Sequence, residues 1–133
     1  MLLNLETDYA IRIIDCLAAA DKRLDGKTIA AQTGVTQRFS LKILHRLVSS
    51  DLVKSYKGAK GGYVLARPAD EITLLEVVEK VSGGLQFSKC QCEVGHCTNP
   101  QGLCRFRDVF DEASNNVRES LRKVTFDNKT IKK

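Results

Sequence analysis

The segment between residues 25 and 67 alternates helix-forming and turn-forming stretches in an order that few folds accommodate. Asp25 can cap a short helical stretch ending at residue 33, which Gly34 interrupts, and Thr36 can cap a second helix. Apolar residues recur every three or four positions along that second helix and predict one apolar face, made of Phe39, Ile43, Leu44, Leu47 and Val48. Two helices separated by a tight glycine turn predict a helix-turn-helix.

Two short β-prone runs follow the second helix. LVKSY at residues 52–56 and YVLAR at residues 63–67 are joined by KGAKGG, which predicts a glycine-containing hairpin. Gly58, Gly61 and Gly62 permit positive φ angles and close backbone approach, although turn geometry alone also explains them. A helix-turn-helix followed by a basic hairpin is typical of a winged helix.

The charge of the chain is concentrated in the same window. Residues 21–67 carry ten Lys or Arg against three Asp, a net +7, whereas the whole chain is +5, so the remainder is −2. A positive centre suits a polyanion such as nucleic acid, and a solvated basic face is the alternative. The helix-turn-helix pattern within the window favours double-stranded DNA.

The second helix is thin enough to enter the major groove, where polar residues near its start can reach base edges. The candidates for base contact are Thr36, Gln37, Arg38 and Lys42, with His45 and Arg46 farther along the same helix. Lys57 and Lys60 on the hairpin can contact phosphate or the minor groove. A metal-binding role for His45 is disfavoured because no second ligand shares its helix.

The flanking helices predict a homodimer. The N-terminal helix is apolar around much of its circumference, with one stripe containing Leu5, Tyr9 and Cys16, and we expect Cys16 to be a core residue. Thr73 and Glu76 form a capping box at the start of another helix, which ends near Gly83. A long polar helix then presents a narrow apolar seam suited to pairing: Phe106, Phe110, Ala113, Val117, Leu121 and Val124.

Four cysteines lie between residues 90 and 104, in the run KCQCEVGHCTNPQGLC. Their Gly, Pro, Asn and Gln neighbours are typical of a loop, so ligands or redox chemistry is a better interpretation than core packing. The chain shows no signal peptide and no membrane-spanning run, so we expect a cytoplasmic protein without a disulfide framework. The remaining interpretations of the cysteine run are an iron-sulfur cluster, zinc or free redox-active thiols. The Cys-x-Cys spacing argues against zinc, because it is shorter than the usual zinc spacing.

Nearly the whole chain resembles a known family. The order TDYAIR, helix-turn-helix, SYKGAKGGYVLARP, cysteine run and long helix is similar to the bacterial winged-helix regulators IscR and NsrR, and most of all to the NsrR branch, since Arg-Phe-Arg follows the last cysteine. The resemblance implies a homodimeric transcription regulator, expected to be a repressor, whose [4Fe-4S] or [2Fe-2S] cluster controls DNA binding in response to nitric oxide, redox state or iron.

The resemblance also implies a ligand set: Cys92, Cys97 and Cys104 of one subunit together with Asp8 of the partner subunit. Cys90 is the alternative first ligand, because a gapless count from the wing reaches it instead of Cys92. His96, beside Cys97, is a conceivable ligand but more ordinarily a residue that tunes the site.

These inferences define a fold class that is mainly α with a small β-hairpin wing, a winged helix-turn-helix with a long C-terminal dimerisation helix. We expect a DNA-binding domain at residues 1–82, a cluster-binding loop at 83–104, and the dimerisation helix and tail at 105–133. An enzyme is disfavoured, because no paired carboxylates or phosphate-cradling loop occur. The alternative function is a cluster-free winged-helix regulator that reads a metabolite, a partner protein or thiol oxidation, or that carries structural zinc.

Overall fold

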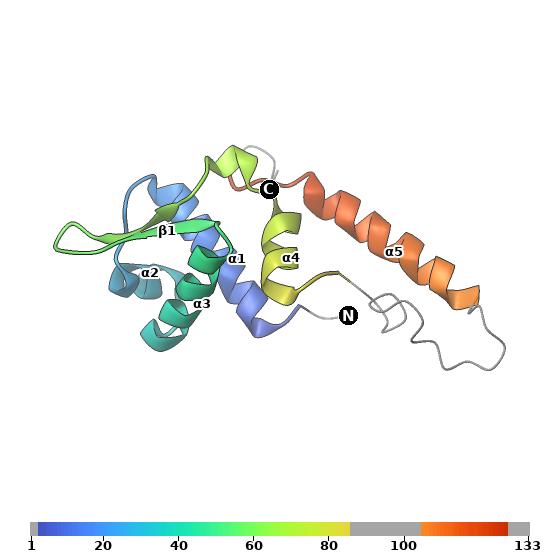
Figure 1. Cartoon of the computed structure of the whole chain (residues 1–133), viewed down its shortest axis with the longest axis horizontal. Coiled ribbons are helices and arrows are strands. Elements are labelled where there is room, and N and C mark those ends of the chain that lie inside the picture. The colour runs from blue at the N-terminus through green and yellow to red at the C-terminus, as the bar shows by residue number, and fades with distance from the viewer. Residues whose placement is uncertain (1–2, 86–104, 128–133) are drawn as a thin grey trace.

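The computed structural model describes residues 3–85 and 105–127 and confirms the predicted fold class. The chain forms five α-helices, one 3-10 turn and one hairpin in these residues (Figure 1). In order they are α1 (Leu5–Ala20), α2 (Gly26–Thr33), α3 (Gln37–Ser49), β1 (Val53–Tyr56), β2 (Gly62–Leu65), η1 (Ala69–Glu71), α4 (Leu74–Ser82) and α5 (Arg105–Arg122). The four clustered cysteines and His96 lie outside the described residues.

The helix boundaries follow from side-chain caps. Asp25 Oδ1 accepts a hydrogen bond from the backbone N–H of Thr28 at 2.6 Å, and Thr36 Oγ1 accepts one from Phe39 N–H at 3.3 Å. Between them, Gly34 ends α2 with a left-handed φ of 74°, which glycine adopts without steric cost. The predicted helix-turn-helix and both of its caps are therefore confirmed.

The core lies where α1 crosses α2, α3 and α4. Aliphatic side chains from all four helices meet there and are almost fully buried, among them Ile13, Ile29, Leu44 and Val77. Phe126, which follows α5 in sequence, joins the same cluster at 7% exposure. The segment after α5 thus returns to the winged-helix core.

The wing is an antiparallel hairpin that pairs Val53 with Leu65 and Tyr56 with Gly62. Leu24 pairs with the edge of β2 that faces away from β1, because its backbone exchanges hydrogen bonds of 3.1 and 2.8 Å with Tyr63. Gly62 has a φ of 145°, and a Cβ atom there would lie 2.7 Å from the carbonyl oxygen of Leu24. Only glycine permits this close approach.

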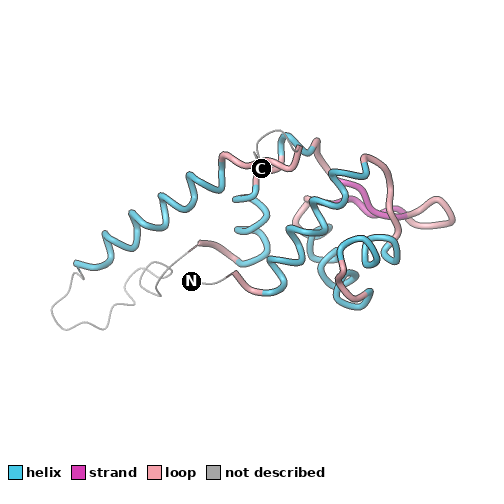
Figure 2. Tube along the Cα trace, turned by 180° about the vertical axis from the view of Figure 1, so that it is seen from behind, coloured by secondary structure: helices cyan, strands magenta, loops and turns pink. Residues whose placement is uncertain are grey.

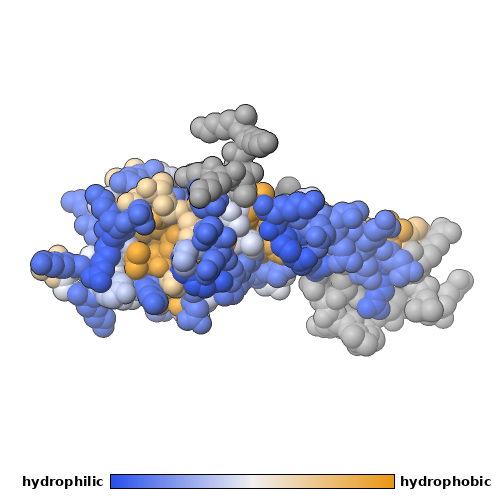
Figure 3. Space-filling view, turned by 90° about the horizontal axis from the view of Figure 1, so that it is seen from above, coloured by the Kyte–Doolittle hydropathy of each residue, from blue (hydrophilic) through white to orange (hydrophobic). Residues whose placement is uncertain are grey.

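α5 extends away from the rest of the fold (Figure 2). Its C-terminal half packs Val117 and Leu121 against α4, whereas Phe106 and Val109 near its start are 52% and 60% exposed. Seen from above, α5 is mostly hydrophilic apart from hydrophobic atoms near its projecting end (Figure 3). Among the described residues, no helix combines the length and apolarity that crossing a membrane requires.

Two expectations about apolar residues were wrong. Phe39 is 43% exposed, because it lies on the flank of α3 and meets the ring of Tyr9 edge-on at 6.1 Å instead of entering the core. Cys16 is half-buried at the edge of the core, where its thiol donates to Gln32 Oε1 at 3.2 Å and burial raises its pKa.

Candidate nucleic-acid interface

α3 has one buried face and one exposed face. Ser40, Ile43, Leu44 and Leu47 face the core and are at most 2% exposed. At 100° per residue, Arg38, Lys42 and His45 fall on the opposite side of the helix. All eight DNA-binding candidates are exposed side chains: Thr36, Gln37, Arg38, Lys42, His45 and Arg46 on or beside α3, and Lys57 and Lys60 on the wing.

A groove separates the start of α3 from the wing. Gln37 and Leu41 of α3 line one wall, and Tyr56 and Lys57 of the hairpin line the other, around a volume of about 540 Å³. The structure therefore brings candidates from both elements, Gln37 and Lys57, to the same groove.

The wing is braced by a residue to which the sequence pattern assigned no role. The Arg23 guanidinium lies over the ring of Tyr56, 3.7 Å from its centroid, and Arg23 Nη1 donates to the carbonyl oxygen of Lys60 at 3.4 Å. One arginine from the segment before α2 thus contacts both the end of β1 and the turn of the hairpin. Its position in the basic window was visible in the sequence, but its contact with the wing was not.

The other side of α3 meets an acid. Glu6 in the first turn of α1 accepts hydrogen bonds from Lys42 Nζ and Arg46 Nη1, each at 2.8 Å. Lys42 and then Arg46 hold the pKa of the Glu6 carboxyl below its usual value. Two of the eight candidates are therefore ion-paired within the subunit.

Asp8 lies one half-turn farther along α1. Its carboxylate pairs with Arg12 at 3.1 Å, and both side chains are 51% exposed. An exposed pair between neighbouring turns of one helix is easily exchanged, so the Asp8 carboxylate is accessible to other binding partners. Within residues 3–85 and 105–127, no group of three or more His, Cys, Asp or Glu could hold a metal ion.

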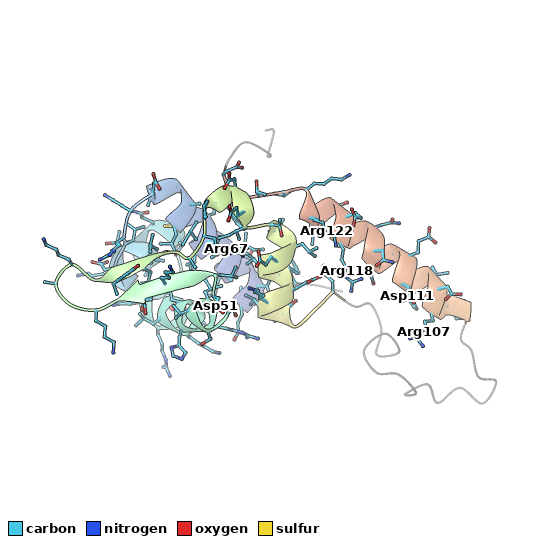
Figure 4. The ribbon with its side chains drawn as sticks, turned by 45° about the horizontal axis from the view of Figure 1, so that its top comes forward. Asp51, Arg67, Arg107, Asp111, Arg118 and Arg122 are labelled. Carbon is cyan, nitrogen blue, oxygen red and sulfur yellow. The ribbon has the colours of Figure 1, made fainter. Side chains whose placement is uncertain are left out.

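The end of α4, close to the first turn of α1 (Figure 1), is held by α5. Arg118 extends from α5 toward α4 (Figure 4) and donates through Nη2 to the carbonyl oxygen of Leu85 at 2.8 Å, while its Nε lies 3.5 Å from Glu79. On the wing side, Arg67 and Lys80 both bind the Glu76 carboxylate. The Thr73 hydroxyl caps α4 by accepting a hydrogen bond from Glu76 N–H at 3.1 Å. Of these contacts, the Arg118 hydrogen bond holds Leu85, the last described residue before the cysteine run.

A basic, exposed α3 beside a braced hairpin is the architecture of a winged-helix DNA-binding protein. Residues 3–128 match the Rrf2 family, described as an iron-dependent transcriptional regulator, and the chain belongs to this family of DNA-binding transcription regulators.

Named relatives support this membership. The HTH-type transcriptional regulator NsrR of Shouchella clausii is 32% identical over 117 residues, which cover 85% of this chain and 77% of that protein. Protein aau3 of Rhizobium meliloti is 34% identical over 129 residues, 96% of this chain and 83% of that protein. The chain is thus NsrR-like, as the sequence pattern predicted.

Solved structures share the fold. The structure of CymR, the global cysteine regulator of B. subtilis, matches with a TM-score of 0.76 and 24% identity over 96% of this chain and 95% of that one. T. potens IscR matches with a TM-score of 0.74 and 22% identity, over 95% of this chain and 83% of that one.

Proposed function

We propose that this regulator is a homodimeric repressor whose affinity for its operator depends on an iron-sulfur cluster sensing nitric oxide, redox state or iron. The observation that carries the proposal is that all eight basic or polar candidates on α3 and the wing are exposed, with Gln37 and Lys57 lining the groove between the two elements. Thr36, Gln37 and Arg38 read bases in the major groove, and Lys57 and Lys60 bind phosphate or the minor groove.

The exposed end of α5 supports pairing of two subunits. Phe106, Val109 and Phe110 are 39–60% exposed on one stretch of a helix that leaves its own core. A second copy of α5 would cover these side chains, of which Phe106 and Phe110 belong to the apolar seam predicted from the sequence. In such a dimer two copies of α3 bind two half-sites of one operator.

The proposed cluster ligands are Cys92, Cys97 and Cys104 of one subunit, with Cys90 as the alternative first ligand, and Asp8 of the partner subunit. Thiolates are the donors that iron-sulfur clusters require, and an oxygen ligand leaves one corner open to nitric oxide or oxygen. Support comes from the NsrR-like sequence and from the exposed, exchangeable Asp8–Arg12 pair. A change at Asp8 acts on the first turn of α1 and thereby on the spacing of the two α3 helices.

The first test is an absorption spectrum with iron and sulfide analysis of protein purified without oxygen. Visible bands with matching iron and sulfide support the cluster. DNA binding to the protein's own promoter is then compared for intact, nitrosylated and cluster-free protein, and equal affinities would refute control by the cluster.

The second candidate is a cluster-free regulator of the same fold, which reads a metabolite, a partner protein or thiol oxidation, or carries zinc. It is kept because a protein named as a cysteine regulator shares the fold. A colourless protein that resists reconstitution with iron and sulfide supports it, and zinc analysis separates its two forms.

A further inference from the structure

The first turn of α1 packs along one flank of α3. Glu6, whose side chain is 28% exposed, is 2.8 Å from both Lys42 Nζ and Arg46 Nη1, with one carboxylate oxygen for each cation. Next to this junction, the rings of Tyr9 and Phe39 meet edge-on. One acid is therefore built into a contact between two helices, where it serves two cations.

The two cations lie one turn apart on α3. By helical position Lys42 belongs to the exposed face with Arg38, whereas Arg46 is turned toward α1. Glu6 holds both side chains on the α1 flank, and the three groups together carry a charge of +1 instead of +2.

We propose that Glu6 competes with DNA phosphate for Lys42 and Arg46 and so sets how many cations α3 offers to DNA. The inference rests on the proposed DNA-binding role of α3. Carboxylate and phosphate oxygens accept the same N–H donors, so each cation can serve only one of them fully. The side chains of Lys42 and Arg46 are 66% and 48% exposed, which means that water screens the pairs and phosphate can displace Glu6.

The same turn offers a route for regulation. Asn4 caps α1 by accepting from both the N–H and the hydroxyl of Thr7, at 2.8 and 2.7 Å, and its carbonyl oxygen accepts from Asp8 N–H. Glu6 and Asp8 therefore belong to one hydrogen-bonded turn. Whatever binds Asp8 acts on the turn that determines how far Glu6 reaches toward α3.

The experiment measures the affinity of the full-length protein for a promoter fragment and for an unrelated fragment of equal length, over a range of salt concentrations. Glu6→Gln removes the charge and keeps the shape, and Glu6→Ala provides a second variant compatible with a helix. The matched control is Glu71→Gln, which removes one exposed negative charge from η1, away from α3 (Figure 1).

We expect both Glu6 variants to bind both fragments more tightly, by about three- to tenfold, since phosphate contacts do not depend on sequence. The plot of log K against log salt should steepen by about 1 to 2 for each α3 that is bound, because each gained phosphate contact adds about 0.9. Glu71→Gln should change neither quantity measurably.

A background variant separates direct competition from long-range charge. With Lys42→Gln and Arg46→Gln both present, adding Glu6→Gln should no longer raise affinity. A gain that persists in this background overturns the proposal, as does weaker binding or an unchanged salt slope for the single variants. If the wild-type protein binds neither fragment in both its intact and its cluster-free form, the DNA-binding role of α3 itself is refuted, whereas wild-type binding with unchanged Glu6 variants refutes only the competition.

Discussion

Phe126 should contribute to the stability of the winged-helix core although it follows the last helix in sequence. Its side chain is 7% exposed within the main cluster, and its N–H donates to the carbonyl oxygen of Ala69 at 3.1 Å. A second hydrogen bond, from Leu74 N–H to the carbonyl oxygen of Val124 at 2.8 Å, fixes the same segment. Phe126 therefore anchors the end of α5 to the core.

The magnitude follows from the buried area. A phenylalanine side chain removes about 150 Å² from water, which at about 25 cal/mol per Å² corresponds to about 4 kcal/mol. Because the unfolded chain already buries part of this area, we expect Phe126→Ala to lower the free energy of unfolding by about 3 kcal/mol. Urea denaturation followed by circular dichroism measures the change.

Phe110→Ala is the matched control, since it removes the same atoms from a side chain that is 39% exposed on the projecting half of α5. We expect it to raise the dissociation constant of the dimer in sedimentation experiments and to leave helical content unchanged. Equal losses of folding stability in the two variants, or a loss below about 1 kcal/mol for Phe126→Ala, would refute the anchoring role.

Three further perturbations test the wing and the α4 contact. Gly62→Ala should destabilise the fold by about 1–3 kcal/mol, because φ is 145° and the new Cβ atom would lie 2.7 Å from the carbonyl oxygen of Leu24. Gly58→Ala, which has open space around its Cβ position, should lower the thermal stability less. Arg23→Lys should weaken operator binding nearly as much as Arg23→Ala, because lysine keeps the charge but loses the planar stacking on Tyr56; near-wild-type binding by Arg23→Lys argues for charge alone. Burial opposes ionisation of Glu76, but hydrogen bonds from Arg67 and Lys80 hold its pKa below the usual 4.5. The stability that the ionised Glu76 contributes to the fold is therefore present above pH 4.5 and lost as pH falls through the folded pKa. The difference in the free energy of unfolding between wild type and Glu76→Gln, measured by urea denaturation, should therefore shrink below that pH. A difference that stays constant with pH argues against the pairing.

The parts of the fold that sequence predicted are the ones determined by nearby residues. Asp25, Thr36 and Thr73 each cap a helix through an N–H three residues later, and Gly34 ends α2 within the same short window. Such signals need no knowledge of the remaining chain. The hairpin and the apolar face of α3 were predicted for the same reason.

The contacts that shape the candidate interface join residues distant in sequence. Glu6 is 36 and 40 residues from Lys42 and Arg46, and Arg23 is 37 residues from Lys60. No periodicity connects such positions, because each depends on how α1 and the wing pack on α3. The error at Phe39 has the same origin, since its position on the helix suggests burial but Tyr9 meets it at the surface. The cysteine ligand set remains a prediction, because residues 86–104 lie outside the described structure.

The packing of α1 limits how the signal proposed to act at Asp8 can reach DNA. Ile13, Ile14 and Leu17 are at most 2% exposed, and α1 contacts α2, α3, α4 and β2, so sliding the whole helix would disrupt the entire core. In its first turn Thr7 is buried, but the side chains of Glu6 and Asp8 make partly exposed ion pairs. A change confined to these two side chains costs little packing and still alters the contacts of α3 with Glu6. The first turn of α1 is therefore the part of the described fold best suited to couple Asp8 to the DNA-binding helix.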